Sequence, residues 1–338
     1  MKNLNVLVTG GAGYIGSHTV LSLLEQDYSV SVVDNLCNGN IESLRRVENI
    51  TKKKVNFFEG DVRDPSFLKK IFFKHHFDYV IHFAGLKAVS ESIKNPAEYY
   101  DVNFSGTLNL ITAMQLRGCN NLVFSSSATV YGQNASVPYV ESLERGDSTS
   151  PYGSTKSSVE NFLEELSVSS KSWSIINLRY FNPIGAHLSG EIGEDPNGVP
   201  NNLLPFISQV AVGARKKLQI FGGDYQTPDG TCRRDYIHVM DLAEGHVAAL
   251  KHLKKPGCES FNLGSGVPYS VLEIVNKFEL ISGVRIPYEI TDRRSGDLDE
   301  FWADASKANN AFKWKATRSL NEMIADTWRW QSKNPKGY

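Results

Sequence analysis

Short, almost continuously apolar runs recur through the first 180 residues, and segments of helical length and periodicity separate them. An apolar run without polar alternation is typical of a strand that helices cover on both faces, as in a parallel sheet. The intervening segments fit the crossover helices that such a sheet requires. The predicted strands lie at residues 6–8, 30–33, 55–58, 79–83, 122–124 and 175–178. This part of the chain is therefore predicted to form an α/β fold with a doubly wound parallel sheet.

Two long helices and a change in amino-acid composition after residue 180 complete the pattern. One helix is expected from about Asn95 to Gln115, and another opens at Pro151, a residue favoured in the first helical turn. Residues 181–200 are rich in Gly, Pro, Asn and Asp, which predicts a loop. The elements expected beyond it are a helix at 203–214, a strand at 218–221, a polar loop at 222–231 and a final amphipathic helix at about 320–330. We therefore expect two lobes, residues 1–180 and a smaller mixed α/β lobe over residues 181–338.

Composition narrows the class of partner. The 338 residues include 36 basic and 37 acidic side chains and are 41% hydrophobic, as in an ordinary soluble globular protein. This near-zero balance gives no electrostatic footprint for nucleic acid, so a small molecule is the expected partner. Four cysteines without regular spacing fit free thiols in a reducing compartment. The N-terminal residues run directly into a strand and no apolar stretch approaches roughly 18 residues, so we expect a cytoplasmic protein without membrane contact.

A glycine-rich segment at residues 9–16 follows the first predicted strand directly and precedes a helical pattern at residues 15–25. Gly10 permits a tight turn, Gly13 lets the backbone approach a pyrophosphate, and Gly16 allows close contact between helix and sheet. Free amides at the helix start then face the phosphate charge. The segment predicts a Rossmann-type dinucleotide site in the first lobe.

Further cofactor contacts are expected outside the carboxyl ends of the next strands. Asp34 ends the second strand, where a carboxylate accepts hydrogen bonds from ribose hydroxyls and repels a 2′-phosphate, which favours NAD over NADP. Asp61 and Val62 follow the third strand, near the expected adenine. The small-residue loop at residues 83–87 follows the fourth strand and would pass beneath the cofactor.

The candidate catalytic residues are Tyr152, Lys156 and Ser127. Tyr152 and Lys156 are one helical turn apart, and Ser127 follows the fifth strand, so all three converge on the nicotinamide side of the sheet. A tyrosine titrates near pH ~10, and lowering its pKa by ~3 units requires about 4 kcal/mol. We expect Lys156 and the nicotinamide charge to supply this together, making Tyr152 a base.

Other chemistries lack their motifs in this sequence. His82 lies inside an apolar strand and is expected to be a core histidine with satisfied hydrogen bonds. No HExxH or Cys/His cluster indicates a metal site. No Gly-x-Ser-x-Gly segment indicates a serine hydrolase.

Seven segments, distributed from end to end, are specific enough to carry a family resemblance. They are residues 82–89, 125–132, 150–153, 178–187, 193–203, 234–241 and 296–306. With the glycine-rich start, they make the chain resemble the UDP-glucose 4-epimerases of the extended short-chain dehydrogenase/reductase family. The resemblance implies reversible interconversion of UDP-galactose and UDP-glucose through a transient 4-keto sugar, with NAD held tightly. It also implies a homodimer formed through the two long helices.

The resemblance extends the list of expected site residues. The cofactor contacts become Gly10, Gly13, Tyr14, Ile15, Gly16, Asp34, Asn35, Leu36, Cys37, Asn38, Gly39, Asp61, Val62, Phe83, Ala84, Gly85, Lys87, Asn103, Ser125, Tyr152, Lys156 and Tyr180. The substrate contacts become Lys87, Ser127, Ala128, Thr129, Tyr152, Phe181, Asn182, Asn202, Leu203, Gln219, Ile220, Phe221, Arg234, Arg294, Asp297 and Phe301. The first lobe then becomes an NAD-binding Rossmann domain and the second mainly a UDP-sugar-binding lobe, with about 235–262 returning to the Rossmann domain.

Phe301 bears on specificity, because in the family this position closes the pocket around the sugar 2-substituent. An aromatic residue there resembles the forms restricted to UDP-glucose and UDP-galactose, so we expect little turnover of N-acetylated sugars. Two other readings remain. A nucleotide-sugar dehydratase would need an acid/base carboxylate pair where this chain has Ala128 and Thr129. A non-enzymatic NAD-binding protein would have no need of Ser127, Tyr152 and Lys156.

Overall fold

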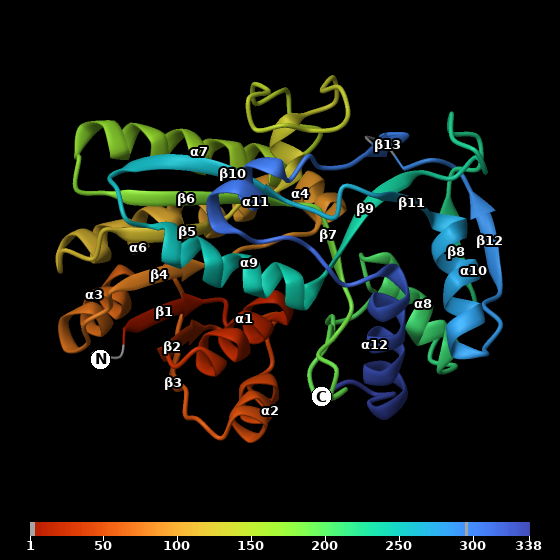
Figure 1. Ribbon diagram of the computed structural model, residues 1–338, viewed down its shortest axis with the longest axis horizontal. Coiled ribbons are helices and arrows are strands. Elements are labelled where there is room, and N and C mark those ends of the chain that lie inside the picture. Colours follow the sequence, from red (N-terminus) through yellow and green to blue (C-terminus); the bar gives the residue numbers. More distant parts are fainter. Residues whose placement is uncertain (1–3, 295–296) are drawn as a thin grey trace.

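A seven-stranded parallel sheet forms the centre of the larger lobe in this computed structural model, which describes residues 4–294 and 297–338 (Figure 1). The strand order is β10-β6-β5-β4-β1-β2-β3. The strands are β1 (Asn5–Thr9), β2 (Ser29–Asp34), β3 (Asn56–Glu59), β4 (Tyr79–His82), β5 (Asn121–Ser125), β6 (Ser174–Tyr180) and β10 (Gly257–Leu263). The six strands expected from apolar runs are confirmed, and so is the doubly wound α/β fold.

Helices cover both faces of this sheet, which explains the continuous apolar character of its strands. Along β1, Val6 and Val8 pack into one core cluster and Leu7 packs into the other. The helices on the Val6 face are α1 (Tyr14–Glu25), α2 (Ile41–Thr51), α9 (Val239–His252) and α11 (Ser306–Phe312). The helices on the Leu7 face are α3 (Pro65–Lys74), α6 (Gly106–Gln115) and α7 (Pro151–Ser169).

The long helix expected over residues 95–115 is present but interrupted. Pro96 begins the short helix α5 (Pro96–Tyr99), which follows α4 (Val89–Lys94). A π-helical segment, Tyr100–Ser105, then leads into α6. A π segment inserts an extra residue into a helix and often marks a functional site. Asn103 lies on this segment.

The smaller lobe, on the right of Figure 1, has its own sheets and core. Its strands are β7 (Asn182–Ile184), β8 (Leu218–Phe221), β9 (Arg233–His238), β11 (Pro268–Ser270), β12 (Tyr288–Thr291) and β13 (Glu300–Phe301). Its helices are α8 (Leu203–Ala211), α10 (Val271–Ser282) and α12 (Leu320–Lys333). β9 pairs with β7, β11 and β13, and β8 pairs with β12.

Two expectations for the second lobe need correction. Residues 181–200 were expected to form only a loop, but β7 lies within them and pairs with β9, more than 50 residues away. Local composition could not show that pairing. The helix expected to reach residue 214 ends at Ala211, because Gly213 adopts a positive φ of 78°.

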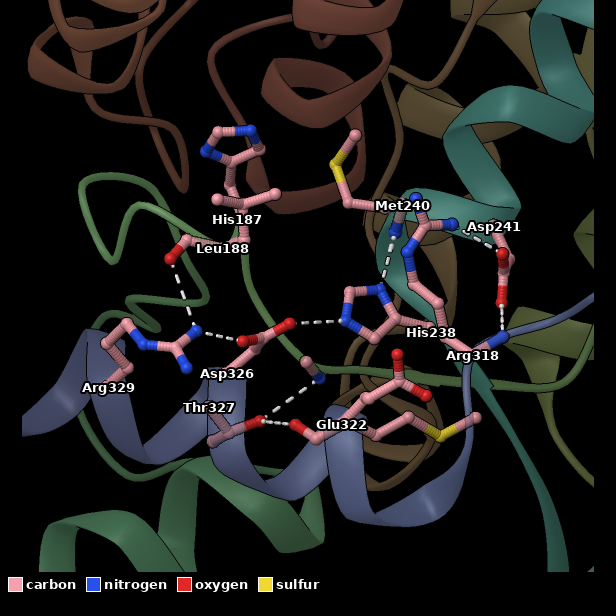
Figure 2. A network of polar contacts seen from close by, with 12 residues as sticks. His187, Leu188, His238, Met240, Asp241, Arg318, Glu322, Asp326, Thr327 and Arg329 are labelled. Carbon is pink, nitrogen blue, oxygen red and sulfur yellow. Dashed lines mark hydrogen bonds and ion pairs between the residues drawn. The ribbon is translucent and has the colours of Figure 1, made fainter.

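A polar network fastens α12 to the start of α9, where β9 ends (Figure 2). His238, the N-cap of α9, contacts Asp326 through its Nε2 at 3.2 Å. The Asp326 carboxylate also accepts a hydrogen bond from Arg329, and Asp241 accepts one from the backbone N–H of Arg318 at 3.0 Å. These contacts join the C-terminal helix to the larger lobe. None of the described helices is long and apolar enough to cross a membrane.

Candidate active site

The glycine-rich turn between β1 and α1 lies against the loop that follows β4. Gly10 has a φ of +71°, and a Cβ atom there would lie 2.7 Å from the backbone nitrogen of Ala84. A Cβ atom on Gly16 would lie 2.2 Å from the Gly10 carbonyl oxygen, so neither position admits a side chain. Gly13 is the N-cap of α1, and no side chain caps this helix. The amides of its first turn are therefore free to bind an anion such as a pyrophosphate.

Two residues at the start of α1 do more than offer backbone amides. The Tyr14 hydroxyl donates a hydrogen bond to the Gly185 carbonyl at 2.7 Å and so joins the two lobes. Ile15 packs against the core on the α1 face of the sheet. Their expected cofactor contacts are therefore limited to the backbone and the exposed edges of the side chains.

Asp34 ends β2 beside this turn, as the sequence predicts. Its Oδ2 accepts from the Ala12 N–H and its Oδ1 from the Leu36 N–H, both at 2.9 Å. Burial raises the pKa of Asp34, and these two hydrogen bonds oppose that rise. A Cβ atom on Gly39 would lie 3.0 Å from Asp34 Oδ1, so the glycine keeps space open beside the carboxylate. Lone pairs that remain on the carboxylate suit ribose hydroxyl donors.

The expected adenine end is built from the loops after β2 and β3. Asn35 donates from Nδ2 to Asp61 at 2.9 Å, and Asn35 Oδ1 accepts from the Cys37 N–H at 3.1 Å. Hydrogen bonds from Arg63 lower the pKa of Asp61 to about 2, so it is ionised near neutral pH. Val62 is buried in the core, so only its backbone faces this region. Asn38 is exposed next to Gly39.

Lys87, expected to contact both cofactor and substrate, and Asn202, expected to contact the substrate, meet at one carboxylate. Lys87 Nζ lies 3.2 Å from Glu194 Oε1, and Asn202 Nδ2 donates to the same oxygen at 2.6 Å. Lys87 follows β4, whereas Glu194 and Asn202 belong to the second lobe. Glu194 therefore neutralises Lys87 and orients the amide of Asn202 across the junction. Leu203 follows Asn202 as the first residue of α8 and packs against the core of that lobe.

The buried side chain of Asn103 makes hydrogen bonds to two separate segments of the site. Its Oδ1 accepts from the Leu86 N–H at 2.7 Å, and its Nδ2 donates to the Leu86 carbonyl and to Thr155, each at 3.0 Å. It thus fixes the loop after β4 to the start of α7. A Cβ atom on Gly85 would lie 3.0 Å from Asn103 Oδ1, which explains the small residue in this loop. Phe83 packs on His246 at 4.7 Å on the other side.

The strand end at Ser125–Ser127 and the first turns of α7 come together. Lys156 Nζ donates to the Ser125 carbonyl at 2.7 Å, and Lys156 is only 6% exposed. The Ser127 hydroxyl accepts from Thr129 Oγ1 at 3.0 Å, and it opposes the rise that burial causes in the pKa of Tyr152. Tyr180 hydrogen-bonds Ser125. A phenol, a nearby hydroxyl and an ammonium group therefore occupy one site.

Opposing effects act on the pKa of Tyr152. Burial raises its pKa, and the Ser127 hydroxyl offsets only part of this rise. Burial also lowers the pKa of Lys156 to about 8. The lowering of the Tyr152 pKa by Lys156 and the nicotinamide charge together therefore stays a prediction. Desolvation of the phenolate outweighs the local partners until a further positive charge is present.

Two arginines and an aspartate mark the expected nucleotide end. Arg234 is buried, and its Nη2 lies 3.7 Å from Asp297. Arg294 is half exposed, lies 4.0 Å from Asp297, and stacks on the Phe221 ring at 4.2 Å. Asn182 Oδ1 is buried with no hydrogen-bond partner, so it is open to a ligand donor. The arginines, the aromatic ring and the open amide suit a pyrophosphate joined to a planar base.

The three substrate contacts expected on β8 differ in what they expose. Ile220 on β8 is buried in the core of the second lobe, and only its backbone is available. Gln219 is exposed and donates to Glu289 at 3.4 Å. Residue alternation along β8 puts Phe221 on the Gln219 side, where it meets Arg294.

Phe301 belongs to an aromatic cluster next to Ser127. Its ring stacks on Tyr139 at 6.1 Å, lies 5.9 Å from Phe181, and carries the Arg234 guanidinium at 4.6 Å. Ala128 is buried in the same cluster. The chain therefore brings Phe301, Phe181 and Ala128 together although they are far apart in sequence. Gly296, in one segment that carries the resemblance, lies outside the described residues.

His82 is confirmed as a core histidine, since its ring nitrogens contact Thr9 at 2.6 Å and Thr107 at 2.9 Å. The sequence reading missed Glu160, Arg179 and Glu194, three charged residues packed around the site. A signal existed for two of them. Glu160 lies four residues after Lys156 on the same helix, and Arg179 interrupts an apolar strand.

Comparisons with known proteins agree with this geometry. The NAD dependent epimerase/dehydratase family matches residues 6–264, well over half of the chain. The chain belongs to this family. It is also 56% identical over 335 residues to a UDP-glucose 4-epimerase of Erwinia amylovora, covering 99% of each protein. The family resemblance read from the sequence is thereby confirmed.

Two solved structures are similar over nearly the whole chain. A UDP-glucose 4-epimerase from Bifidobacterium longum in complex with NAD+ and UDP is 49% identical with a TM-score of 0.97, covering 99% of this chain and 100% of that one. A UDP-Glc/GlcNAc 4-epimerase from Campylobacter jejuni is 35% identical with a TM-score of 0.85, covering 98% of this chain and 100% of that one. Relatives of this fold thus include an enzyme named for N-acetylated sugars.

Proposed function

We propose that this protein interconverts UDP-galactose and UDP-glucose by reversible epimerisation at C4 of the hexose. The observation that carries the proposal is 56% identity to a UDP-glucose 4-epimerase over 99% of both chains. The free amides of α1, the open space beside Asp34 and the absence of a side chain at Gly10 and Gly16 all suit NAD as the resident cofactor. When bound, NAD would accept the hydride that leaves C4 of the hexose. Its oxidised form would also place a positive charge beside Tyr152.

Tyr152 is assigned as the base that takes the proton of the sugar 4-hydroxyl. The Ser127 hydroxyl favours the phenolate against the effect of burial, and Lys156 contributes a positive charge one helical turn away. After the 4-keto sugar turns its opposite face to the site, Tyr152 returns the proton as an acid. The same residue must therefore serve both epimers in turn.

The substrate is assigned to the junction between the lobes. Arg234, Arg294, Asn182 and Asn202 would hold the UDP, with Phe221 beside the base. Strong charge-assisted contacts at this end leave the hexose free to turn about its glycosyl-phosphate bond. The first lobe, residues 1–180 with a return at about 235–262, would bind NAD, and residues 181–338 would mainly bind the UDP-sugar.

We assign the specificity to Phe301. Its ring is packed between Tyr139 and Phe181 and supports Arg234, so it has little freedom to move away from a bulky sugar 2-substituent. UDP-glucose and UDP-galactose are therefore the proposed substrates, and UDP-N-acetylglucosamine is expected to be a poor one.

Assembly and compartment follow the same reasoning. We propose a homodimer through the two long helices, α7 and the α5–α6 segment, where Tyr100 presents an exposed aromatic side chain and Ile93 is exposed on the adjoining α4. We propose a cytoplasmic location, since the four cysteines are free.

The decisive experiment supplies UDP-galactose to the purified protein without added NAD. Formation of UDP-glucose, with NAD released on denaturation, is expected. Copurified NAD with no product would instead favour a non-enzymatic NAD-binding protein. The dehydratase alternative is not favoured, because Ala128 is packed among aromatic rings and Thr129 donates its hydroxyl to Ser127.

A further inference from the structure

Behind the Ser125–Ser127 turn, a pair of opposite charges is buried in the larger lobe. Glu160 on α7 has no exposed surface, and Arg179 on β6 is 3% exposed. Arg179 donates from Nε to both Glu160 oxygens at 3.0 and 3.2 Å and from Nη2 to Oε2 at 2.6 Å. A buried charge persists in a protein only when it is paired and hydrogen-bonded in this way.

A hydrogen bond connects this pair directly to the Ser125–Ser127 turn. The Ser126 hydroxyl donates to Glu160 Oε1 at 2.5 Å, while Lys156 Nζ donates to the Ser125 carbonyl at 2.7 Å. Lys156 and Glu160 are one helical turn apart, so the same face of α7 holds two consecutive residues of the turn. Ser127 is the next residue, and α7 also carries Tyr152. The distance between Ser127 and Tyr152 therefore depends on these two tethers.

A second layer supports the pair from outside. Arg145 donates to Glu160 Oε2 at 3.3 Å and grips Glu164 through two hydrogen bonds at 2.6 and 2.7 Å. The Arg179 guanidinium lies 4.9 Å from the Tyr131 ring, which closes the short 3₁₀ helix after Ser127. The Glu160–Arg179 pair therefore contacts residues on both sides of Ser127, namely Ser126 before it and Tyr131 after it.

Glu160 is also the carboxylate that acts on Lys156. The titratable groups around Lys156 are Tyr152, His82 and Glu160. Burial lowers the pKa of His82 to about 3, so its ring is neutral at pH 7, and burial raises the pKa of Tyr152. Burial lowers the pKa of Lys156 to about 8, and the charge of Glu160 opposes this.

The groups around Glu160 itself are Arg145, Arg179, Glu164 and Cys258. Burial raises the pKa of Cys258 to about 12, so the thiol is neutral. Arg145 and Arg179 carry positive charge at any relevant pH. Removing the Glu160 charge would therefore leave Lys156 without the buried carboxylate that favours its protonated form, while Arg145 would keep its pairing with Glu164.

We propose that Glu160 is a positioning residue for the reaction, fixing the Ser127 turn through Ser126 and keeping Lys156 protonated through its charge. The proposal rests on the proposed function and deepens it, because it assigns the geometry and charge of the Tyr152 site to a fully buried residue outside the expected cofactor and substrate contacts.

Three variants test it in the NAD-bound protein. Ser126→Ala breaks the tether and keeps the ion pair, and Glu160→Gln removes the charge at nearly constant volume. Glu164→Gln is the matched control, because it makes the same charge change on the same helix and also pairs with Arg145, yet no hydrogen bond joins it to the turn.

Ser126→Ala should lower kcat on the order of tenfold with KM for UDP-galactose within about twofold, because a small displacement of Ser127 misaligns the proton transfer. Glu160→Gln should move the alkaline limb of the kcat/KM profile to lower pH by about one unit, because Lys156 loses its proton earlier. Glu164→Gln should change neither quantity.

Phenolate absorbance of the NAD-bound protein, minus that of Tyr152→Phe, provides a readout that does not depend on turnover. In Glu160→Gln the Tyr152 phenolate should form at higher pH than in the wild type, with UDP affinity unchanged by calorimetry. The proposal would be overturned if Glu160→Gln shifted neither the alkaline limb of the kcat/KM profile nor the pH at which the Tyr152 phenolate forms. It would also be overturned if Glu164→Gln shifted them as much as Glu160→Gln does. If Glu160→Gln does not fold, an unchanged kcat in Ser126→Ala overturns it. If the wild type converts no UDP-galactose, the proposed function fails, and the phenolate titration still decides the role of Glu160.

Discussion

Replacing Lys156 with methionine should abolish turnover and at the same time make the cofactor-free protein more stable. Lys156 is 6% exposed, and its ammonium group has one hydrogen-bond acceptor, the Ser125 carbonyl at 2.7 Å, and lies 4.8 Å from the Phe124 ring. Methionine has nearly the same length and fills the same space without a charge. The substitution therefore removes the cost of burying the ammonium group and keeps the packing.

The magnitude follows from the pKa of Lys156, which burial lowers from 10.5 to about 8. At pH 7 this difference corresponds to about 3 kcal/mol of lost stability, since one pKa unit is ~1.4 kcal/mol. Loss of the hydrogen bond to Ser125 lowers the stability of the variant by about 1 kcal/mol. Lys156→Met should therefore raise the free energy of unfolding by about 2 kcal/mol at pH 7.

The pH dependence has a definite sign. Because the folded-state pKa is the lower one, the unfolded chain binds more protons between pH 8 and 10.5. Wild-type stability therefore rises through this window, and the advantage of the variant shrinks. At pH 10 the charge-burial cost falls to less than about 1 kcal/mol, so the two proteins should be nearly equal.

Urea unfolding of the NAD-free proteins at pH 7 and pH 10 measures both quantities. Lys69→Met on α3 serves as the control, because this lysine is exposed and its loss should change stability by less than about 0.5 kcal/mol. A Lys156→Met protein that is less stable than the wild type at pH 7 would refute the reasoning. So would a difference that persists unchanged at pH 10.

Three further substitutions test separate parts of the site. Tyr152→Phe should lower the interconversion rate by about 10²–10⁴ while NAD stays bound, and substantial activity in the UDP-galactose assay would show that Tyr152 is not the base. Gly16→Ala should abolish NAD retention, because the added Cβ would lie 2.2 Å from the Gly10 carbonyl oxygen, and full cofactor absorbance in the purified variant would contradict this. Phe301→Cys should open the pocket to UDP-N-acetylglucosamine, whereas comparable wild-type rates on both sugar classes would refute the specificity assignment.

Local pattern determined a large part of this protein. The six continuous apolar strands, the glycine turn, Asp34 at the end of β2 and the opening of α7 at Pro151 all lie where the sequence predicts them. Each depends on residues that are neighbours along the chain, such as the strand-to-helix turn at Gly10 or the i to i+4 spacing of Tyr152 and Lys156. The family itself could also be identified from such segments.

Long-range packing decided the rest. The short strand β7 forms by pairing with the distant strand β9. Glu194 contacts both Lys87 of the first lobe and Asn202 of the second only in the folded protein. The pKa of Tyr152 depends on long-range packing as well, because burial raises it. Helical spacing shows which groups are adjacent, but desolvation depends on how many distant residues cover them, and only the tertiary structure contains that information.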